Sequence, residues 1–252
     1  MVDRVNRAID WDYSALAEHY RHRAPYASDA LRQLFALTAL PRGAAAVDIG
    51  AGTGRFTAAL VGEAFAVTAV EPNRQMCAVG RQAVPQAHWI ATRGEATGLA
   101  SAECDLVSFG SSFNVLPPAA ALSESARLLK RAGWLVCLWN HRDLDAPLQA
   151  ELQAIVEREV PGYSHGARRD DPSAAIVGDG RFDTPRRLVG RTSHDIRCTD
   201  FVAGFRAHAT LIRQAGDALP RVLDALSLRL ADRERIVVPF VTRVFAAQRR
   251  AA

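Results

Sequence analysis

The sequence predicts an α/β fold: a doubly wound, mostly parallel sheet of seven strands with helices on both faces. Between residues 44 and 143, short apolar runs alternate with stretches of helical periodicity, which is typical of βαβ units. A glycine-rich turn directly follows the first of these runs. At 252 residues, the chain is long enough to bury one sizeable core, so we expect a single domain.

The first strand is expected over Ala44–Ile49, an apolar run interrupted only by Asp48. Three glycines follow, Gly50, Gly52 and Gly54, and a helix is expected from Arg55 to Val61. Glycine permits the positive φ angles of a strand-to-helix reversal and lets a ligand approach the backbone. The free amides of such a turn lie at a helix N-terminus.

This turn resembles the first motif of the class I S-adenosylmethionine (SAM)-dependent methyltransferases, which reads apolar-Asp-apolar-Gly-x-Gly-x-Gly. A dinucleotide site would have the spacing G-x-G-x-x-G, whereas Arg55 stands where its third glycine would be. Asp48 would repel a pyrophosphate and suits a ligand that carries a cation. The resemblance implies a Rossmann-like methyltransferase fold with SAM as cofactor, bound in part by the residues of this turn: Asp48, Gly50, Gly52 and Gly54.

The second and third strands are expected over Ala66–Val70 and His88–Thr92. Glu71, at the tip of the second strand, is placed to accept hydrogen bonds from the two hydroxyls of a ribose. Pro72 is expected to begin the following helix, which continues through Asn73–Ala83 and places Met76 near the adenine. After the third strand, the resemblance implies that Glu95 and Ala96 hold the adenine.

The fourth strand is expected over Asp105–Gly110, and the resemblance implies that its end lies beside the transferred methyl group. Phe109, Gly110 and Ser111 are therefore further candidate cofactor-binding residues. Methyltransferases that act on the exocyclic amines of nucleic acids carry Asn/Asp-Pro-Pro-aromatic at this strand end, whereas Pro117-Pro118 comes later here and is followed by Ala119. Nucleic acid is accordingly an improbable acceptor.

Beyond this point, a helix over Ala119–Lys130, ended by Gly133, leads to a fifth strand at Trp134–Trp139. A helix capped by Asp145 should reach Val160, and the loop over 161–186 has no period. A sixth strand is expected near Arg197–Phe201, then helices over Val202–Leu230 and a last strand over Ile236–Ala246.

Two helices are expected before the first strand, one from Asp12 or Ser14 to about Arg21 and one from Ser28-Asp29 to Thr38. The expected organisation is therefore an N-terminal helical cap (1–43), a SAM-binding core (44–141), a lid insertion (142–205) and C-terminal helices with the last strand (206–252). The resemblance implies that the N-terminal segment helps to cover the substrate.

The composition limits the partners. The chain carries a net charge of +4 and has a pI near 9.2, but its basic residues are spread in pairs such as Arg168-Arg169, which we expect to be solvated. The four cysteines show no metal-ligand spacing, so no metal is expected. No apolar run is long enough to span a membrane and the N-terminus is charged, so we expect a cytoplasmic monomer or homodimer with no membrane partner.

Three histidines are candidate general bases: His141, His22 and His208. His141 follows the fifth strand, on the side where open α/β sheets bind ligands. The passage from Gly110 to Asp143 looks like a bacterial small-molecule branch of the methyltransferases. Methylation of O, N or C of a metabolite in a biosynthetic pathway is thus one hypothesis. Methylation of RNA or protein and SAM binding without methyl transfer remain alternatives. The walls of the acceptor pocket are expected to come from Tyr20–Tyr26, Ser111–Asn114, His141-Arg142 and the helix with Arg206 and His208. Arginines outnumber acids in these segments, which favours an anionic acceptor.

Overall fold

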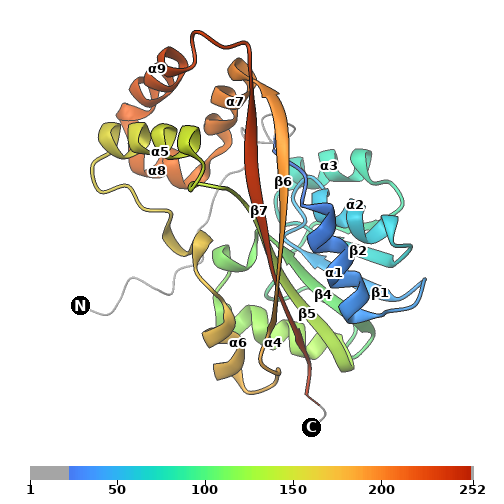
Figure 1. The fold of residues 1–252 in the computed structure, drawn as a ribbon. Helices are drawn as coiled ribbons and strands as arrows, with labels where there is room; N and C mark the ends of the chain where they lie inside the picture. Colours follow the sequence, from blue (N-terminus) through green and yellow to red (C-terminus); the bar gives the residue numbers. More distant parts are fainter. Residues whose placement is uncertain (1–22, 251–252) are drawn as a thin grey trace.

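The computed structural model describes residues 23–250 of the chain (Figure 1). The helix expected between Asp12 and Arg21, the candidate base His22 and the rest of residues 1–22 of the expected N-terminal cap lie outside the described residues. In the described part of the chain, no helix is long and apolar enough to cross a membrane.

Within residues 23–250, the strands form one seven-stranded sheet in the order β3-β2-β1-β4-β5-β7-β6. Only β7 runs antiparallel to its neighbours, β5 and β6. The predicted fold class, a mostly parallel doubly wound sheet, is confirmed. The strands are β1 Ala45–Ile49, β2 Ala66–Val70, β3 His88–Ile90, β4 Cys104–Gly110, β5 Leu129–Arg142, β6 Arg186–Arg197 and β7 Arg235–Gln248.

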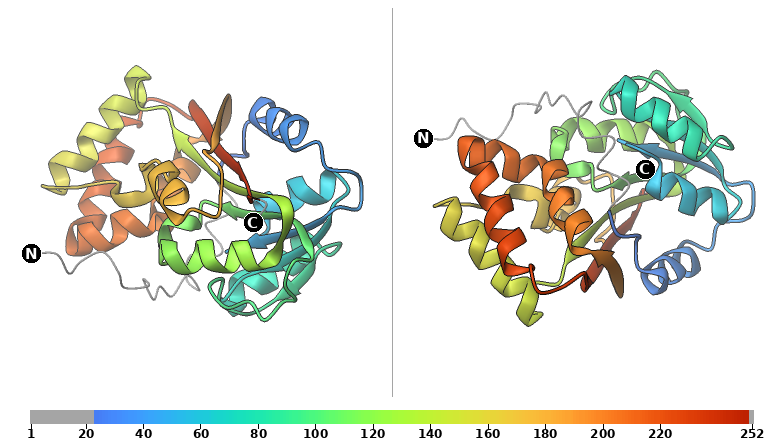
Figure 2. Two further views of the ribbon diagram at one scale, coloured as in Figure 1. Left: turned by 90° about the horizontal axis from the view of Figure 1, so that it is seen from below. Right: turned by 90° about the horizontal axis from the view of Figure 1, so that it is seen from above.

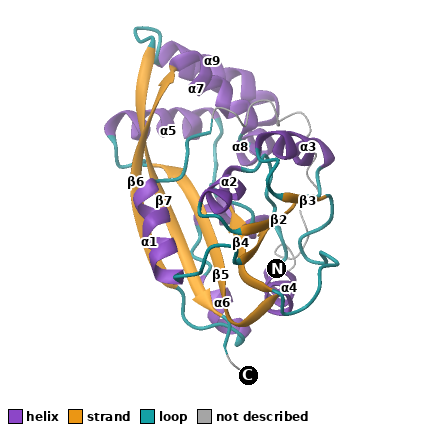
Figure 3. Cartoon of the chain, turned by 90° about the vertical axis from the view of Figure 1, so that its right-hand side faces the viewer, coloured by secondary structure: helices purple, strands orange, loops and turns teal. Residues whose placement is uncertain are grey.

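Helices cover both faces of the sheet because each buried strand sends alternate side chains to opposite sides. In β1, Ala46 packs with the helices α1 (Ser28–Thr38), α2 (Arg55–Gly62) and α3 (Arg74–Ala83), whereas Val47 packs on the other face with α4 (Pro118–Leu128) and α6 (Ser173–Asp179). The helix α1 lies across β6 and β7 (Figure 3), where Ala27 N–H donates to Thr242 Oγ1 at 2.8 Å.

Four further helices form a helical cap at the ends of β6 and β7: α5 Pro147–Glu159, α7 Cys198–Gly204, α8 Ala209–Ala215 and α9 Leu219–Arg229. The cap has an apolar core of its own, which includes Leu152, Leu226 and, from the strand ends, Ile196 and Val238. It lies at the top of Figure 1, and both views in Figure 2 place it on the far side of the molecule from α1 to α3.

The predicted position of the sixth strand, near Arg197–Phe201, was wrong. The strand β6 spans Arg186–Arg197, in the stretch expected to be partly loop, and Cys198–Gly204 is helical. The twelve residues of β6 include five charged residues and a glycine, so they lack the apolar run by which the other strands were found. Gly190 is needed because a Cβ there would lie 2.6 Å from the Ala30 amide nitrogen of α1. The range 142–205, expected as a lid, thus contributes one edge strand of the sheet.

Three helix boundaries also differ from expectation. Helix α3 begins at Arg74 and not at Pro72, because the Asn73 side chain caps it by accepting from the amides of Gln75 and Met76. Helix α4 ends at Leu128, and Lys130, expected in its last turn, already belongs to β5 and pairs with Asp105 at 2.8 Å. Helix α5 has Ala146 and not Asp145 as its N-cap.

Candidate functional site

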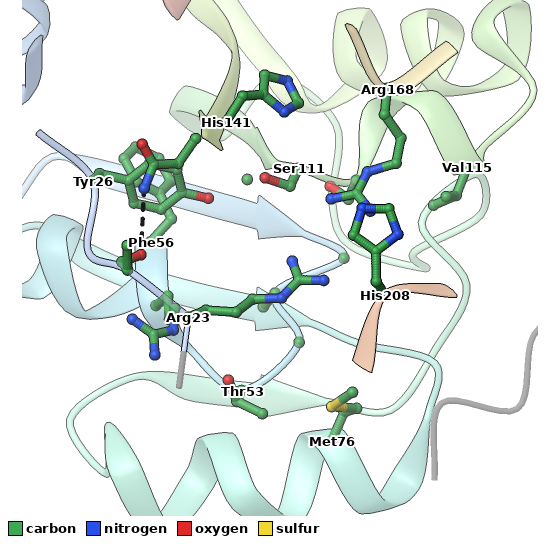
Figure 4. A pocket seen from close by; sticks show the side chains of 18 of the residues that line it. Arg23, Tyr26, Thr53, Phe56, Met76, Ser111, Val115, His141, Arg168 and His208 are labelled. Atoms are coloured by element: carbon green, nitrogen blue, oxygen red, sulfur yellow. Dashed lines mark hydrogen bonds between the residues drawn. The ribbon is translucent and has the colours of Figure 1, made fainter. Parts of the chain in front are cut away.

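The strand ends and the helical cap enclose a cavity of about 810 Å³. Its floor comes from the loops that follow β1, β2, β3 and β4, and its roof comes from the end of β5, from residues 165–169 and from α7 and His208. Figure 4 shows Thr53 and Met76 on one side of this space and His141 and Arg168 on the opposite side. Two halves can therefore be distinguished, a glycine-loop half and a cap half.

The glycine loop adopts the left-handed conformations that its sequence predicts. The φ angles of Gly50, Gly52 and Gly54 are +68°, +57° and +85°. Gly50 and Gly52 line the cavity, and a Cβ on Gly50 would lie 2.5 Å from Ser112 Cβ. Gly54 lies outside the cavity lining, where a Cβ would approach Val84 to 3.0 Å and Trp89 to 3.2 Å. Its role is the close packing of α2.

Asp48 lies at the base of the loop and is 1% exposed. Its carboxylate accepts hydrogen bonds from Thr57 Oγ1 at 2.7 Å and from Ser108 Oγ at 2.9 Å, so it joins the first turn of α2 to β1 and β4. Burial raises the pKa of Asp48 to about 6, and the hydrogen bonds from Thr57 and Ser108 oppose that rise. The residue borders the cavity, but it also holds the loop together.

Glu71 joins the loops that follow β1 and β2. Its Oε2 accepts from the Gly52 amide at 2.8 Å and its Oε1 accepts from the Asn73 amide at 2.9 Å. Burial raises the pKa of Glu71 above its usual value, and these two amides oppose the rise. A carboxylate has about four acceptor sites, so both oxygens keep capacity for a ligand hydroxyl.

The other predicted cofactor-binding residues divide into two groups. Pro72, Met76, Glu95, Gly110 and Ser111 line the cavity. Ala96 and Phe109 lie outside its lining, and Phe109 is fully buried against Phe113, with ring centroids 5.3 Å apart. Phe109 alternates with Ser108 along β4, so its side chain enters the core on the face of α4 and not the cavity.

The end of β4 carries backbone strain. Ser111 has φ +63°, which is unusual for a residue other than glycine, and its amide donates to Leu138 O at 2.8 Å. Its hydroxyl forms a hydrogen bond with the phenol of Tyr26, and burial raises the pKa of Tyr26 to about 12. Tyr26 also packs edge-on against Phe56 at 5.8 Å. The sequence placed Tyr26 only within the N-terminal segment that is expected to help cover the substrate.

Two of the three candidate bases line the cap half, and both are neutral at physiological pH. Burial, together with Arg169, Arg168 and Arg243, lowers the pKa of His141 to about 3. Burial also lowers the pKa of His208 well below its usual value. The Nδ1 of His208 accepts from the Leu211 amide at 3.1 Å and caps α8, so its proton is on Nε2. A general-base role for either residue stays a prediction.

Arginines dominate the cap half. Arg142, Arg168 and Arg169 line the cavity, whereas the Arg168-Arg169 pair was expected to be solvated. The guanidinium of Arg142 lies 5.1 Å from the ring centre of Phe205. Arg142 was expected in the wall of the acceptor pocket, but Arg168 and Arg169 could not be placed beside it, because they come from a loop without periodicity.

Comparisons with known proteins identify the family. Residues 47–137 match a family model described as a methyltransferase domain. The chain is 30% identical over 234 residues to the uncharacterized methyltransferases Rv3342 of Mycobacterium tuberculosis and Mb3374 of Mycobacterium bovis, with 91% of both chains covered in each case.

Solved structures share the fold. YjhP from E. coli superposes with a TM-score of 0.57 at 15% identity, over 94% of this chain and 98% of that one. The [4+2]-cyclase SpnF superposes with a TM-score of 0.54 at 14% identity, over 88% and 80%. With its glycine loop, its sheet order and these relatives, the chain belongs to the class I SAM-dependent methyltransferases.

Proposed function

We propose that this protein binds SAM in the glycine-loop half of the cavity and transfers its methyl group to a small molecule held in the cap half. The observation that carries the proposal is the position of Glu71 and Gly52. The two groups are hydrogen-bonded at 2.8 Å and line the same cavity, so a ribose on Glu71 would lie directly beside the glycine loop. Glu95 borders the same half and would accept from an adenine amine.

The residues of the loop fit this cofactor. Gly52 has open space where a Cβ would project, so the backbone is accessible to a ligand. When bound, SAM supplies a methyl group already activated on a sulfonium, so the protein must mainly align the acceptor and exclude water. The cap supports the exclusion of water, because α7 and His208 line the cavity on the side opposite the glycine loop.

The size of the cavity favours a small acceptor over RNA or protein. Pockets for small ligands measure roughly 300–1,000 Å³, and about 810 Å³ lies in the upper part of that range. The cap half has partly apolar walls, which include Phe201, Phe205 and Phe240. We propose a metabolite as the acceptor, in keeping with a biosynthetic role in the cytoplasm.

Replacement of Glu71 tests the cofactor site. A charge-assisted hydrogen bond contributes ~1.5–3 kcal/mol, so Glu71→Ala should weaken the binding of S-adenosylhomocysteine roughly 10- to 150-fold in calorimetry. Glu63→Ala, at the exposed end of α2, is the matched control and should leave affinity unchanged. An unchanged affinity of folded Glu71→Ala protein would remove the assignment.

Methyl transfer itself needs a separate test, because the fold is shared with the cyclase SpnF. Incubation with SAM and a metabolite extract should yield S-adenosylhomocysteine and a product heavier by one methylene group. Turnover of a small acceptor that is insensitive to salt would exclude the RNA alternative. Tight SAM binding without S-adenosylhomocysteine formation would favour the alternative of binding without methyl transfer.

A further inference from the structure

The guanidinium of Arg142 lies at the cap end of β5 in an unusual environment. Its Nη1 donates to Gln149 Oε1 at 3.1 Å and its Nη2 donates to Gln153 Oε1 at 3.2 Å. Its central carbon lies 5.1 Å from the ring centre of Phe205 and 5.9 Å from that of Phe201. All these partners are neutral, although the side chain lines the cavity.

A second guanidinium lies beside it. Arg169 Nη2 donates to the backbone carbonyl of Arg142 at 3.1 Å, and Arg169 also lines the cavity. Within residues 23–250, neither Arg142 nor Arg169 forms an ion pair with a carboxylate. Of the neighbouring acids, Asp143 pairs with Arg191 and Glu157 accepts from Gln153. Asp143 and Asp145 act on Arg169 only as charges beyond ion-pair distance.

Cations held in a cavity without a counter-ion are costly, because a buried charge is normally paired. Burial and the charge of Arg169 lower the pKa of Arg142 to about 10, so the group remains protonated at neutral pH. Arg169 also lowers the pKa of His141 and of His165, and Arg142 lowers that of His165, although burial is the larger cause in each case. The cap half thus presents positive charge and neutral imidazoles to whatever enters it.

The remaining walls of this half are polar in part, since Asn140, His194 and Asp200 also line the cavity and Asp200 pairs with Arg197 at 2.9 Å. The other walls are apolar. Phe201 and Phe205 of the α7 region and Val238 and Phe240 of β7 line the cavity around the two arginines. A ligand that fits this half has an anionic oxygen group at one end, which contacts the arginines, and an apolar body, which contacts the apolar side chains. Arginine suits such a group because its planar fork can donate two parallel hydrogen bonds.

We propose that the methyl acceptor is an organic oxyanion with an apolar or aromatic body, whose carboxylate or phosphate binds Arg142 and Arg169. This inference rests on the proposed function, since it names the chemical class of the acceptor. It assigns the two arginines a role in binding and orientation. It places the anionic group at the cap, away from the glycine loop.

The test uses the full-length protein saturated with S-adenosylhomocysteine and a panel of acids with their neutral amides: cinnamate, benzoate and octanoate, with phenyl phosphate as the phosphate probe. The acids should bind about 10- to 150-fold more tightly than their amides, as expected for hydrogen bonds to a charged group. Arg142→Met and Arg169→Met, made separately, should remove that preference while amide binding stays the same. Comparison of phenyl phosphate with benzoate tells which oxyanion is favoured.

Arg221→Met is the matched control, because Arg221 is an exposed residue of α9 outside the cavity lining. It should keep the preference for acids. An equal affinity for acids and amides in the parent protein would overturn the inference. So would arginine variants that lose affinity for S-adenosylhomocysteine but keep the preference, since the arginines would then serve the cofactor. If the parent fails to bind S-adenosylhomocysteine at all, the proposed function itself is wrong.

Discussion

At the scale of single residues, Asp48 borders the cavity and links β1 to α2 and β4, and its burial has a cost in stability. Its pKa of about 6 means that the folded state binds a proton more tightly than the unfolded state, whose pKa is near 3.8. Stability should therefore fall as the pH rises from about 4 to about 6. Above that window, the buried charge costs the folded state about 3 kcal/mol.

Asp48→Asn should remove this pH dependence. An amide keeps hydrogen-bonding groups near Thr57 and Ser108 but carries no charge, so the variant should gain stability relative to the parent as the pH rises from 4 to 7. Urea unfolding at both pH values measures the difference in free energy. A difference that is the same at both pH values would show that Asp48 does not titrate in this window.

The glycine-loop residues could be predicted because the relevant signals are local in the sequence. Gly50, Gly52 and Glu71 follow strands at fixed distances, and parallel strands bring those ends to one edge of the sheet. Arg142 and Arg169 could not be predicted as a pair, because nothing in the sequence fixes how residues 161–186 fold back over β5. Phe201 was expected in a strand, so its place in the cavity wall was missed as well.

At the scale of elements, the packing of α2 depends on Gly54. An alanine there would have to adopt φ +85° and would approach Val84 to 3.0 Å, whereas Gly98 has a similar φ of +75° with open space around it. Both substitutions carry the left-handed strain of roughly 1–2 kcal/mol. Gly54→Ala should lose a further ~1–3 kcal/mol from overpacking, as measured by urea unfolding.

Gly98→Ala is therefore the control, and the difference between the two variants isolates the packing of α2. Equal destabilisation of both proteins would mean that the side chains of Val84 and Trp89 move to accommodate the new methyl group without a loss of stability.

The strands that sequence reasoning found and those it missed differ in their surroundings. The strands β1, β2 and β4 are covered on both faces, so they read as apolar runs. The strand β6 lies at the edge of the sheet and has α1 over one face, so charged residues are tolerated along it. Its pairing with β7 along twelve residues is a long-range interaction that no local pattern reveals.

At the scale of the whole molecule, the sheet and the cap have separate apolar cores that meet at the ends of β6 and β7. A protein built in this way can open locally at one core while the other stays folded. The glycine-loop half of the cavity belongs to the sheet and the cap half belongs largely to the cap. We expect the two halves to respond differently to core substitutions.

Leu226→Ala and Leu106→Ala provide a matched pair, since both leucines are fully buried, one in α9 and one in β4. Each substitution should lower the stability of the core that contains it by ~2–5 kcal/mol. Leu226→Ala should speed amide hydrogen exchange over residues 198–230 while calorimetry shows unchanged binding of S-adenosylhomocysteine. Leu106→Ala should lower the stability of the sheet. It should speed hydrogen exchange in the cap only through global unfolding. If both variants speed exchange equally in cap and sheet, the two cores unfold as one unit, and the cap could not open for an acceptor while the cofactor stays bound.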